Sequence, residues 1–251
     1  MSENGPMGRA SDGRVVLVRS RPALAHTVDG VSDSARNAVA LVAPRMRGVL
    51  HEGAFPLSVL AGVWAIAHAP PGTPRVSTAV YAATLSACLG VSAVYHRGHW
   101  STPMRAWLRR LDRATIFLLI AGTFTPIAVV ALPGWLSAAT LIVVWSAALG
   151  GAVLTSVWTN APMLVEIGPY LAVGGFGVVM VPRLLVYLGP VAVGLLALGG
   201  AIYVLGAVVY AVHRPNPWPH TFGFHEIFHA LVVTAAVLQW IVITQWVVPA
   251  A

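Results

Sequence analysis

The chain has 251 residues, of which 57% are hydrophobic and only 9% are charged, and its mean hydropathy is +0.78. A soluble globular domain carries about 25% charged residues, so this composition excludes a soluble enzyme, a disordered chain and a coiled coil. A chain this apolar needs lipid around it, and we expect an all-α protein integral to a membrane. The net charge is +7 and every basic residue is an arginine. The arginines lie in the few segments that are not apolar, which favours membrane orientation over nucleic-acid binding as their role.

Seven stretches are long and apolar enough to cross a bilayer, which takes about 20 residues. They cover residues 53–69, 76–96, 111–132, 135–156, 161–181, 185–211 and 225–248. Proline and glycine separate them, for example at Pro182-Arg183 between the fifth and the sixth. The sequence therefore predicts a seven-transmembrane helical bundle over residues 48–251. Residues 1–47 mix seven arginines with Gly, Pro, Ser and Asp, and we expect a flexible cytoplasmic tail there.

The arginines divide unevenly between the two sides of such a bundle. With the N-terminus inside, thirteen arginines lie on the inner side and only Arg75 and Arg183 lie outside. This asymmetry is typical of cytoplasmic segments, so we expect the N-terminus inside, the C-terminus outside and a multi-pass protein of the plasma membrane. The inner segment from Arg97 to Arg110 is predicted to be a short basic loop that contacts anionic lipid.

Four ionisable side chains are expected at one depth of the membrane. His96 ends the second span, Asp112 begins the third, and His225 and His229 begin the seventh. Because successive spans alternate in direction, all four lie near the inner interface. Ionisable groups within a bilayer are costly and are candidates for function.

The spacing of these residues suits a metal ion. His225 and His229 are four residues apart and share one face of a helix. With His96 they form the three-imidazole set of a catalytic zinc site, whose open fourth position holds a water with a pKa lowered to about 7. Asp112 would orient that water or accept its proton, and Ser92, one turn before His96, would orient a ligand or bind a substrate oxygen.

Simpler interpretations stay open for each residue alone. A histidine near the end of a span is commonly hydrogen-bonded or reaches toward the interface without binding a metal. Asp112 also fits the acidic residue at the start of a helix, or the partner of a neighbouring arginine.

Residues 225–229 also match H-E-x-x-H, the pattern of zinc metalloproteases. Such enzymes usually take a third ligand from further along the chain, but no His, Asp or Glu follows His229. The third ligand must come from upstream, which favours His96 and disfavours a protease. Glu226 could serve as a base or face a neighbouring helix. His51, Glu52 and Glu166, near the inner ends of two other spans, could line the entrance of the site.

Several passages resemble the hemolysin III-like membrane proteins, which are related to the progestin and adipoQ receptors (PAQR). They are residues 92–96, 111–117 with 120–126, and 223–229, and residues 47–52 resemble the start of that family. The resemblance covers about residues 44–248. It implies a seven-helix fold with the N-terminus inside and a zinc ion near the cytoplasmic face. By motif, His96, His225 and His229 would be the ligands, with Asp112 and Ser92 beside the zinc-bound water.

The family implies a function less firmly than it implies a site. Its human adiponectin-receptor relatives are associated with ceramide hydrolysis, and its bacterial relatives with haemolysis and membrane homeostasis. The main hypothesis is a zinc-dependent, ceramidase-like hydrolase of a lipid amide or ester. The alternatives are a non-catalytic, zinc-stabilised sensor or regulator of the membrane, and a pore-forming haemolysin. Zinc is inferred from ligand type, and iron or cobalt also accepts three imidazoles and water.

Overall fold

The computed structural model describes residues 44–158 and 163–251, and in these residues it contains helices and no strand. The expected all-α class is confirmed for the described residues. The helices are α2 (Val49–His68), α3 (Thr73–Arg97), α4 (Thr102–Ala131), α5 (Gly134–Val157), α6 (Met163–Gly175), α7 (Gly177–Val212), α8 (Phe224–Val242), the π-helical turn η1 (Ile243–Val247) and the 3₁₀ turn η2 (Val248–Ala250). Most of the predicted tail, residues 1–43, lies outside the described residues.

Six helical segments of the described residues are long and apolar enough to cross a membrane. Five of them correspond to predicted spans and contain α2, α3, α4, α5 and α8. The predicted fifth and sixth spans fall together in one helical stretch of 46 residues, Ile167–Val212. At 1.5 Å per residue this stretch would be roughly 70 Å long if it were straight, about twice the hydrocarbon thickness of a bilayer.

Side-chain contacts show that this stretch reverses its direction. The Tyr170 hydroxyl donates to the Arg113 carbonyl oxygen at 3.2 Å, in the first half of α4. The Tyr187 hydroxyl donates to the Ala250 carbonyl oxygen at 3.1 Å, at the end of the chain. The His213 ring then contacts Phe224, the first residue of α8, with ring centroids 4.7 Å apart. The chain therefore passes from one end of the bundle to the other and returns.

The reversal lies at Gly189, whose φ of 81° and ψ of 170° are not helical. The predicted break at Pro182-Arg183 is wrong, because α7 continues through Pro182. Proline is tolerated within membrane helices when neighbouring groups satisfy the freed carbonyl. A positive φ, in contrast, is adopted readily by glycine alone.

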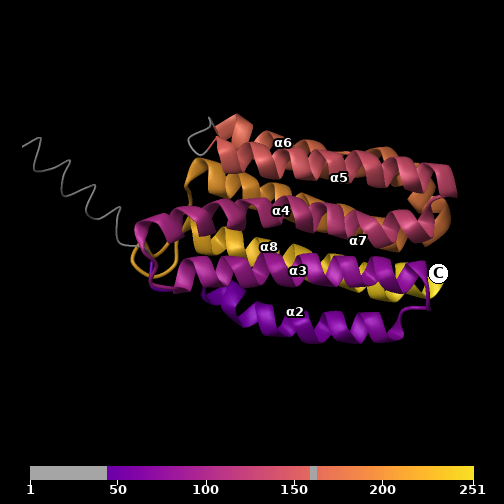
Figure 1. Cartoon of the computed structure of the whole chain (residues 1–251), viewed down its shortest axis with the longest axis horizontal. Helices are drawn as coiled ribbons and strands as arrows, with labels where there is room; N and C mark the ends of the chain where they lie inside the picture. Colours follow the sequence, from indigo (N-terminus) through magenta and orange to yellow (C-terminus); the bar gives the residue numbers. More distant parts are fainter. Residues whose placement is uncertain (1–43, 159–162) are drawn as a thin grey trace, which may run out of the picture. The chain divides into compact units, whose positions relative to one another are not determined.

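The helices of residues 44–251 lie side by side and run roughly parallel or antiparallel to one another (Figure 1). One buried apolar cluster joins the end of α2 with α3, α4, α8 and the turns η1 and η2; its members are Ala69, Tyr81, Leu85, Cys88, Leu89, Leu119, Ala236, Ile243 and Val248. Glycines let the helices approach closely, as in other membrane bundles. A Cβ at Gly122 would collide with Thr84, and one at Gly151 would collide with Phe117. This packing holds α3, α4 and α8 against one another.

Two connecting segments differ from the sequence-based expectation. The predicted basic loop from Arg97 to Arg110 is wrong for most of its length, since only residues 98–101 lie between α3 and α4. Pro103 in the first turn of α4 is preorganised for a helix start, and arginine is a good helix former outside the apolar layer. The backbone N–H groups of Arg45 and Met46 donate to the carbonyls of His220 and Thr221. The end of the predicted tail is thus paired with the α7–α8 connection.

Candidate metal centre

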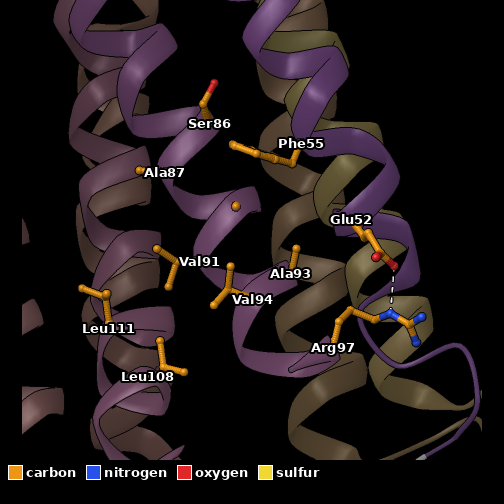
Figure 2. A pocket seen from close by; sticks show the side chains of 11 residues that line it. Glu52, Phe55, Ser86, Ala87, Val91, Ala93, Val94, Arg97, Leu108 and Leu111 are labelled. Carbon is orange, nitrogen blue, oxygen red and sulfur yellow. Dashed lines mark hydrogen bonds and ion pairs between the residues drawn. The ribbon is translucent and has the colours of Figure 1, made fainter. Parts of the chain in front are cut away.

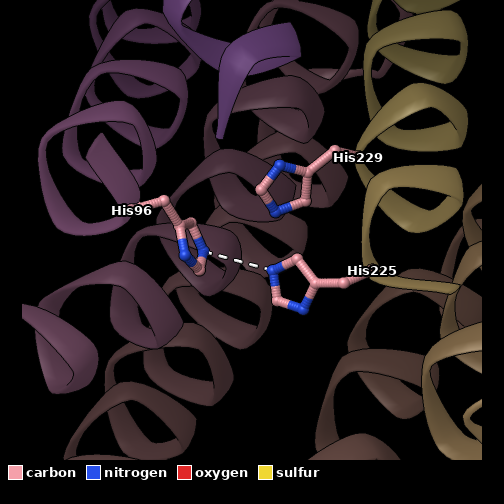
Figure 3. Close-up of side chains that lie close together, drawn as sticks. All are labelled: His96, His225 and His229. Atoms are coloured by element: carbon pink, nitrogen blue, oxygen red, sulfur yellow. Dashed lines mark hydrogen bonds between the residues drawn. The ribbon is translucent and has the colours of Figure 1, made fainter. Parts of the chain in front are cut away.

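Three imidazoles meet at one end of the helices. His96 lies in the last turn of α3, and His225 and His229 lie in the first two turns of α8. Each offers a ring nitrogen, and these three atoms all lie within 4.8 Å of one another. The Nε2 atoms of His96 and His225 are 3.2 Å apart (Figure 3). His96 is far from His225 and His229 in the sequence, but the three residues form one cluster in the structure.

A local hydrogen bond defines where α8 starts, and this start determines where two of the histidines lie. Gly223 is the N-cap, and its N–H donates to Glu226 Oε2 at 2.8 Å. Beginning the helix at Phe224 puts His225 and His229 one turn apart on the same face. Their ring centroids are 4.6 Å apart, and the His96 ring lies 5.1 Å from that of His229.

The donor set fits a transition metal. Two nitrogen ligands, each about 2.0–2.1 Å from a tetrahedral zinc, lie roughly 3.3–3.4 Å apart. The observed separation of 3.2 Å between His96 and His225 is close to this value. The side chains of His96 and His229 are largely buried. The three histidines could therefore hold a metal ion, and imidazole donors suit zinc, iron and cobalt.

Asp112 and Ser92 lie beside this cluster. The Oδ2 atom of Asp112, on α4, is 3.7 Å from His96 Nε2, and the Asp112 side chain is 20% exposed. Ser92 is buried on α3, one turn before His96, and its side chain lies near the Asp112 carboxylate. The structure thus brings together all five residues that the sequence singled out as ligands or catalytic groups.

Glu226 already has partners for both of its oxygens. Oε1 accepts a hydrogen bond from Arg47 Nε at 2.7 Å, and Oε2 accepts the Gly223 N–H. The Glu226 side chain is only 1% exposed. The glutamate of H-E-x-x-H therefore stabilises the start of α8 and ties it to the segment before α2. The sequence did not indicate Arg47 as its partner, because 179 residues separate the two.

The three residues predicted to line the entrance lie in different surroundings. Glu52 is exposed and pairs with Arg97. His51 is buried, and its ring is stacked on the His229 ring, so it lies behind a predicted ligand rather than at an entrance. The side chain of Glu166 lies outside the described part of the structure.

A separate groove of about 680 Å³ runs over α2, α3 and α4 (Figure 2). Phe55, Leu108 and Leu111 are among its apolar residues. Glu52 and Arg97 also line it, and their ion pair has an N–O distance of 2.8 Å. None of the five predicted site residues lines this groove, so it is distinct from the histidine cluster.

A family model described as "Haemolysin-III related" matches residues 39–240 of the chain. Among curated proteins, the chain is 33% identical to a hemolysin-3 homolog of Bacillus subtilis (strain 168) over 126 residues, which is 50% of this chain and 56% of the relative. It is 28% identical to hemolysin-3 of Bacillus cereus over 141 residues, or 56% of this chain and 62% of the relative. It is 29% identical to an adiponectin receptor protein of Drosophila melanogaster over 185 residues, or 61% of this chain and 38% of the relative.

These alignments span little more than half of the two Bacillus proteins and a smaller share of the fly protein. The family model, in contrast, covers most of the chain, including every residue of the histidine cluster. The chain belongs to the haemolysin-III-related family, which confirms the resemblance drawn from its motifs.

Proposed function

We propose that this member of the haemolysin-III-related family is a zinc-dependent hydrolase that cleaves an amide or ester bond of a membrane lipid. The proposal rests on one observation: a carboxylate, Asp112, lies 3.7 Å from His96 within a cluster of three imidazole donors. His96, His225 and His229 would hold the zinc. When bound there, zinc would act as a Lewis acid toward a water molecule and the lipid carbonyl.

The other residues of the site would manage the proton. In the reaction, water adds to the carbonyl carbon, the C–N or C–O bond breaks, and a fatty acid and an amine or alcohol are released. Asp112 would accept the proton of the attacking water and return it to the leaving nitrogen or oxygen. Ser92 would hold the Asp112 carboxylate in place through its hydroxyl. Glu226 takes no part, because its oxygens pair with Arg47 and Gly223.

A lipid substrate is favoured by the position of the site and by one relative. The histidines lie at the ends of helices apolar enough to span a membrane, where the linkage between lipid headgroup and acyl chain is found. The chain is also similar to a protein named as an adiponectin receptor. A ceramide-like amide is the first substrate to test, and a contribution to membrane homeostasis is the cellular role that we propose.

We further propose seven membrane spans, with the N-terminus and the histidine cluster on the cytoplasmic side of the plasma membrane. The reversal at Gly189 supports counting Ile167–Val212 as two crossings. The excess of arginine on the side of the cluster supports its orientation. Labelling of single cysteines placed at each end, in intact and in opened cells, would test both points.

The hydrolase proposal is tested by release of fatty acid from ceramide or phospholipid in vesicles that contain the purified protein. Asp112→Asn keeps the size of the side chain and removes its basicity, so hydrolysis should fall by about 10²–10⁴-fold while bound metal is retained. Arg75→Ala, in the first turn of α3 and so at the opposite end of that helix from His96, is the control and should hydrolyse at the wild-type rate. Unchanged hydrolysis by Asp112→Asn would contradict the proposal.

A second function, a metal-stabilised regulator without catalysis, is favoured by the way the cluster bridges helices. His96, Asp112 and His225 belong to three different helices, so a bound metal would restrain α3 and α8, with α4 beside them. An Asp112→Asn protein that keeps its metal and its effect on membrane composition would support this function and contradict the hydrolase.

The names of the Bacillus relatives raise a third function, a pore. Several buried hydroxyls of the described helices instead bond to their own backbone; examples are Thr78 to Pro74, Thr125 to Ala121 and Thr155 to Gly151. These three side chains are also buried, so they do not line a water-filled path. Leakage of a small dye from vesicles carrying the pure protein would revive the pore hypothesis.

A further inference from the structure

His51, on the first turn of α2, lies directly against the histidine cluster. Its ring is parallel to that of His229, with an interplanar angle of 1° and ring centroids 3.8 Å apart. The His51 residue is 3% exposed, and His229 is buried to the same degree. One face of the His229 imidazole is therefore covered by a second imidazole from a different helix.

The identity of this covering residue is unexpected on packing grounds alone. Neither ring nitrogen of His51 has a partner with hydrogen-bond geometry among the described residues, and the polar group to note near the ring is the backbone of His229 itself. A buried polar group without a partner costs about 1–3 kcal/mol. A phenylalanine would provide the same stacking face without that cost. An imidazole at this position is therefore explained if one of its nitrogens contacts a group that binds at the site.

The stacked arrangement argues against His51 as a fourth ligand of the same ion. An imidazole nitrogen binds a metal close to the plane of its own ring, so an ion held by His229 lies near the plane of the His229 ring. The His51 ring is parallel to that plane and one stacking distance away from it. That separation exceeds a zinc–nitrogen bond of about 2.0–2.1 Å. His51 can face an oxygen ligand of the ion but not the ion itself.

Two contacts fix the beginning of α2 and so hold His51 in this place. Arg47, before the helix, is paired with Glu226 on α8 at 2.7 Å. Gly48, the N-cap of α2, has a φ of 81° and packs so tightly on α3 that a Cβ would lie 2.6 Å from the His96 Cβ. The start of α2 is thus anchored to both helices that carry the cluster.

We propose that His51 is a positioning residue of the metal centre. Its ring face holds the His229 imidazole in the orientation that faces His96 and His225. The N–H of its imidazole donates a hydrogen bond to an oxygen ligand of the bound metal, either water or a substrate carbonyl. This inference rests on the metal site of the proposed function and adds a fourth histidine to it.

The test compares His51→Ala, which removes the ring, with His51→Phe, which keeps the ring face and removes the nitrogens. Metal affinity is measured by competition with a chromophoric chelator, and the ligand environment by the visible spectrum of the cobalt(II)-loaded protein. His68→Ala is the matched control, since His68 is an exposed histidine in the last turn of the same helix. Helical circular dichroism establishes that each variant is folded.

His51→Ala should bind zinc about 10- to 100-fold more weakly than the wild type, as is usual when the residue supporting a metal ligand is removed. His51→Phe should bind zinc nearly as well as the wild type but should shift the cobalt spectrum. His68→Ala should match the wild type in both measurements.

Three results would overturn the inference: wild-type affinity in His51→Ala, an affinity of His51→Phe as low as that of His51→Ala, or an unshifted cobalt spectrum in His51→Phe. If the wild type binds metal, each of these contradicts the role of His51 alone and leaves the hydrolase proposal standing. Folded wild-type protein that binds no metal would contradict both proposals.

Discussion

The Nε2 atoms of His96 and His225 lie 3.2 Å apart, although 129 positions separate the two residues in the chain. Two neutral imidazoles can share one hydrogen bond at this distance, but a third imidazole, a carboxylate and a fourth imidazole also converge on the same place. Such a concentration of donors at the end of an apolar bundle is costly unless something binds there. A metal ion accounts for the cluster better than packing does.

The Arg47–Glu226 ion pair should be important for stability. Arg47→Ala leaves the Glu226 carboxylate, which is 1% exposed, without its charged partner. A buried polar group left without its partner costs about 1–3 kcal/mol, and more when it is charged, so Arg47→Ala should unfold at a lower temperature in detergent. Arg97→Ala is the matched control, because its partner Glu52 is 53% exposed. Exposed pairs contribute about 0–1 kcal/mol, and equal melting temperatures of the two variants would contradict this assignment.

Gly48 should not tolerate a side chain. Gly48→Ala places a Cβ 2.6 Å from the His96 Cβ on a backbone with a φ of 81°. The left-handed conformation alone costs about 1–2 kcal/mol for a residue with a Cβ, and displacement of His96 should also weaken metal binding.

Gly53→Ala, one turn further along α2, is the control for Gly48→Ala, because nothing lies within 4 Å of the position that its new Cβ would take. It should be neutral or slightly stabilising, since alanine is the better helix former. Zinc binding of Gly48→Ala at the level of Gly53→Ala would show that Gly48 does not position His96.

Ser92 should affect the reaction more than the metal. Ser92→Ala removes a hydroxyl beside Asp112 and leaves the three histidines intact. A hydrogen bond to a charged group contributes about 1.5–3 kcal/mol, so lipid hydrolysis should fall by at least about tenfold with bound zinc unchanged. Ser77→Ala provides the control, as Ser77 is buried near the other end of α3 and bonds to the Pro74 carbonyl. If Ser92→Ala loses zinc but not its rate per bound zinc, Ser92 supports the ligands rather than Asp112.

Much of the candidate site could be predicted because helix ends have few possible positions. Because successive spans alternate in direction, the end of one helix lies at the same side of the membrane as the start of the next. This alternation alone predicted that His96, Asp112 and His225 lie together. The shared face of His225 and His229 follows from helical periodicity. The family resemblance, now confirmed by the match to residues 39–240, pointed to the same residues.

The rest depended on features that a single sequence does not reveal. The stacking of His51 on His229 is set by how α2 is rotated against α8, which hydropathy does not encode. The turn at Gly189 was missed because Pro182 looks like the stronger interruption, yet only Gly189 leaves the helical conformation. The beginning of α4 was missed because closely spaced arginines indicate a loop when charge is the only criterion.

The central claim is that His96, His225 and His229 bind one metal ion. Its most direct test is the metal content per chain of detergent-purified protein, measured by mass spectrometry for the wild type, His225→Ala and His99→Ala. His99 is an exposed histidine close to His96 in the chain and serves as the control. We expect about one zinc per chain in the wild type and in His99→Ala, and none in His225→Ala. Folded wild-type protein without metal, or a His225→Ala variant that keeps a full complement, would contradict the claim.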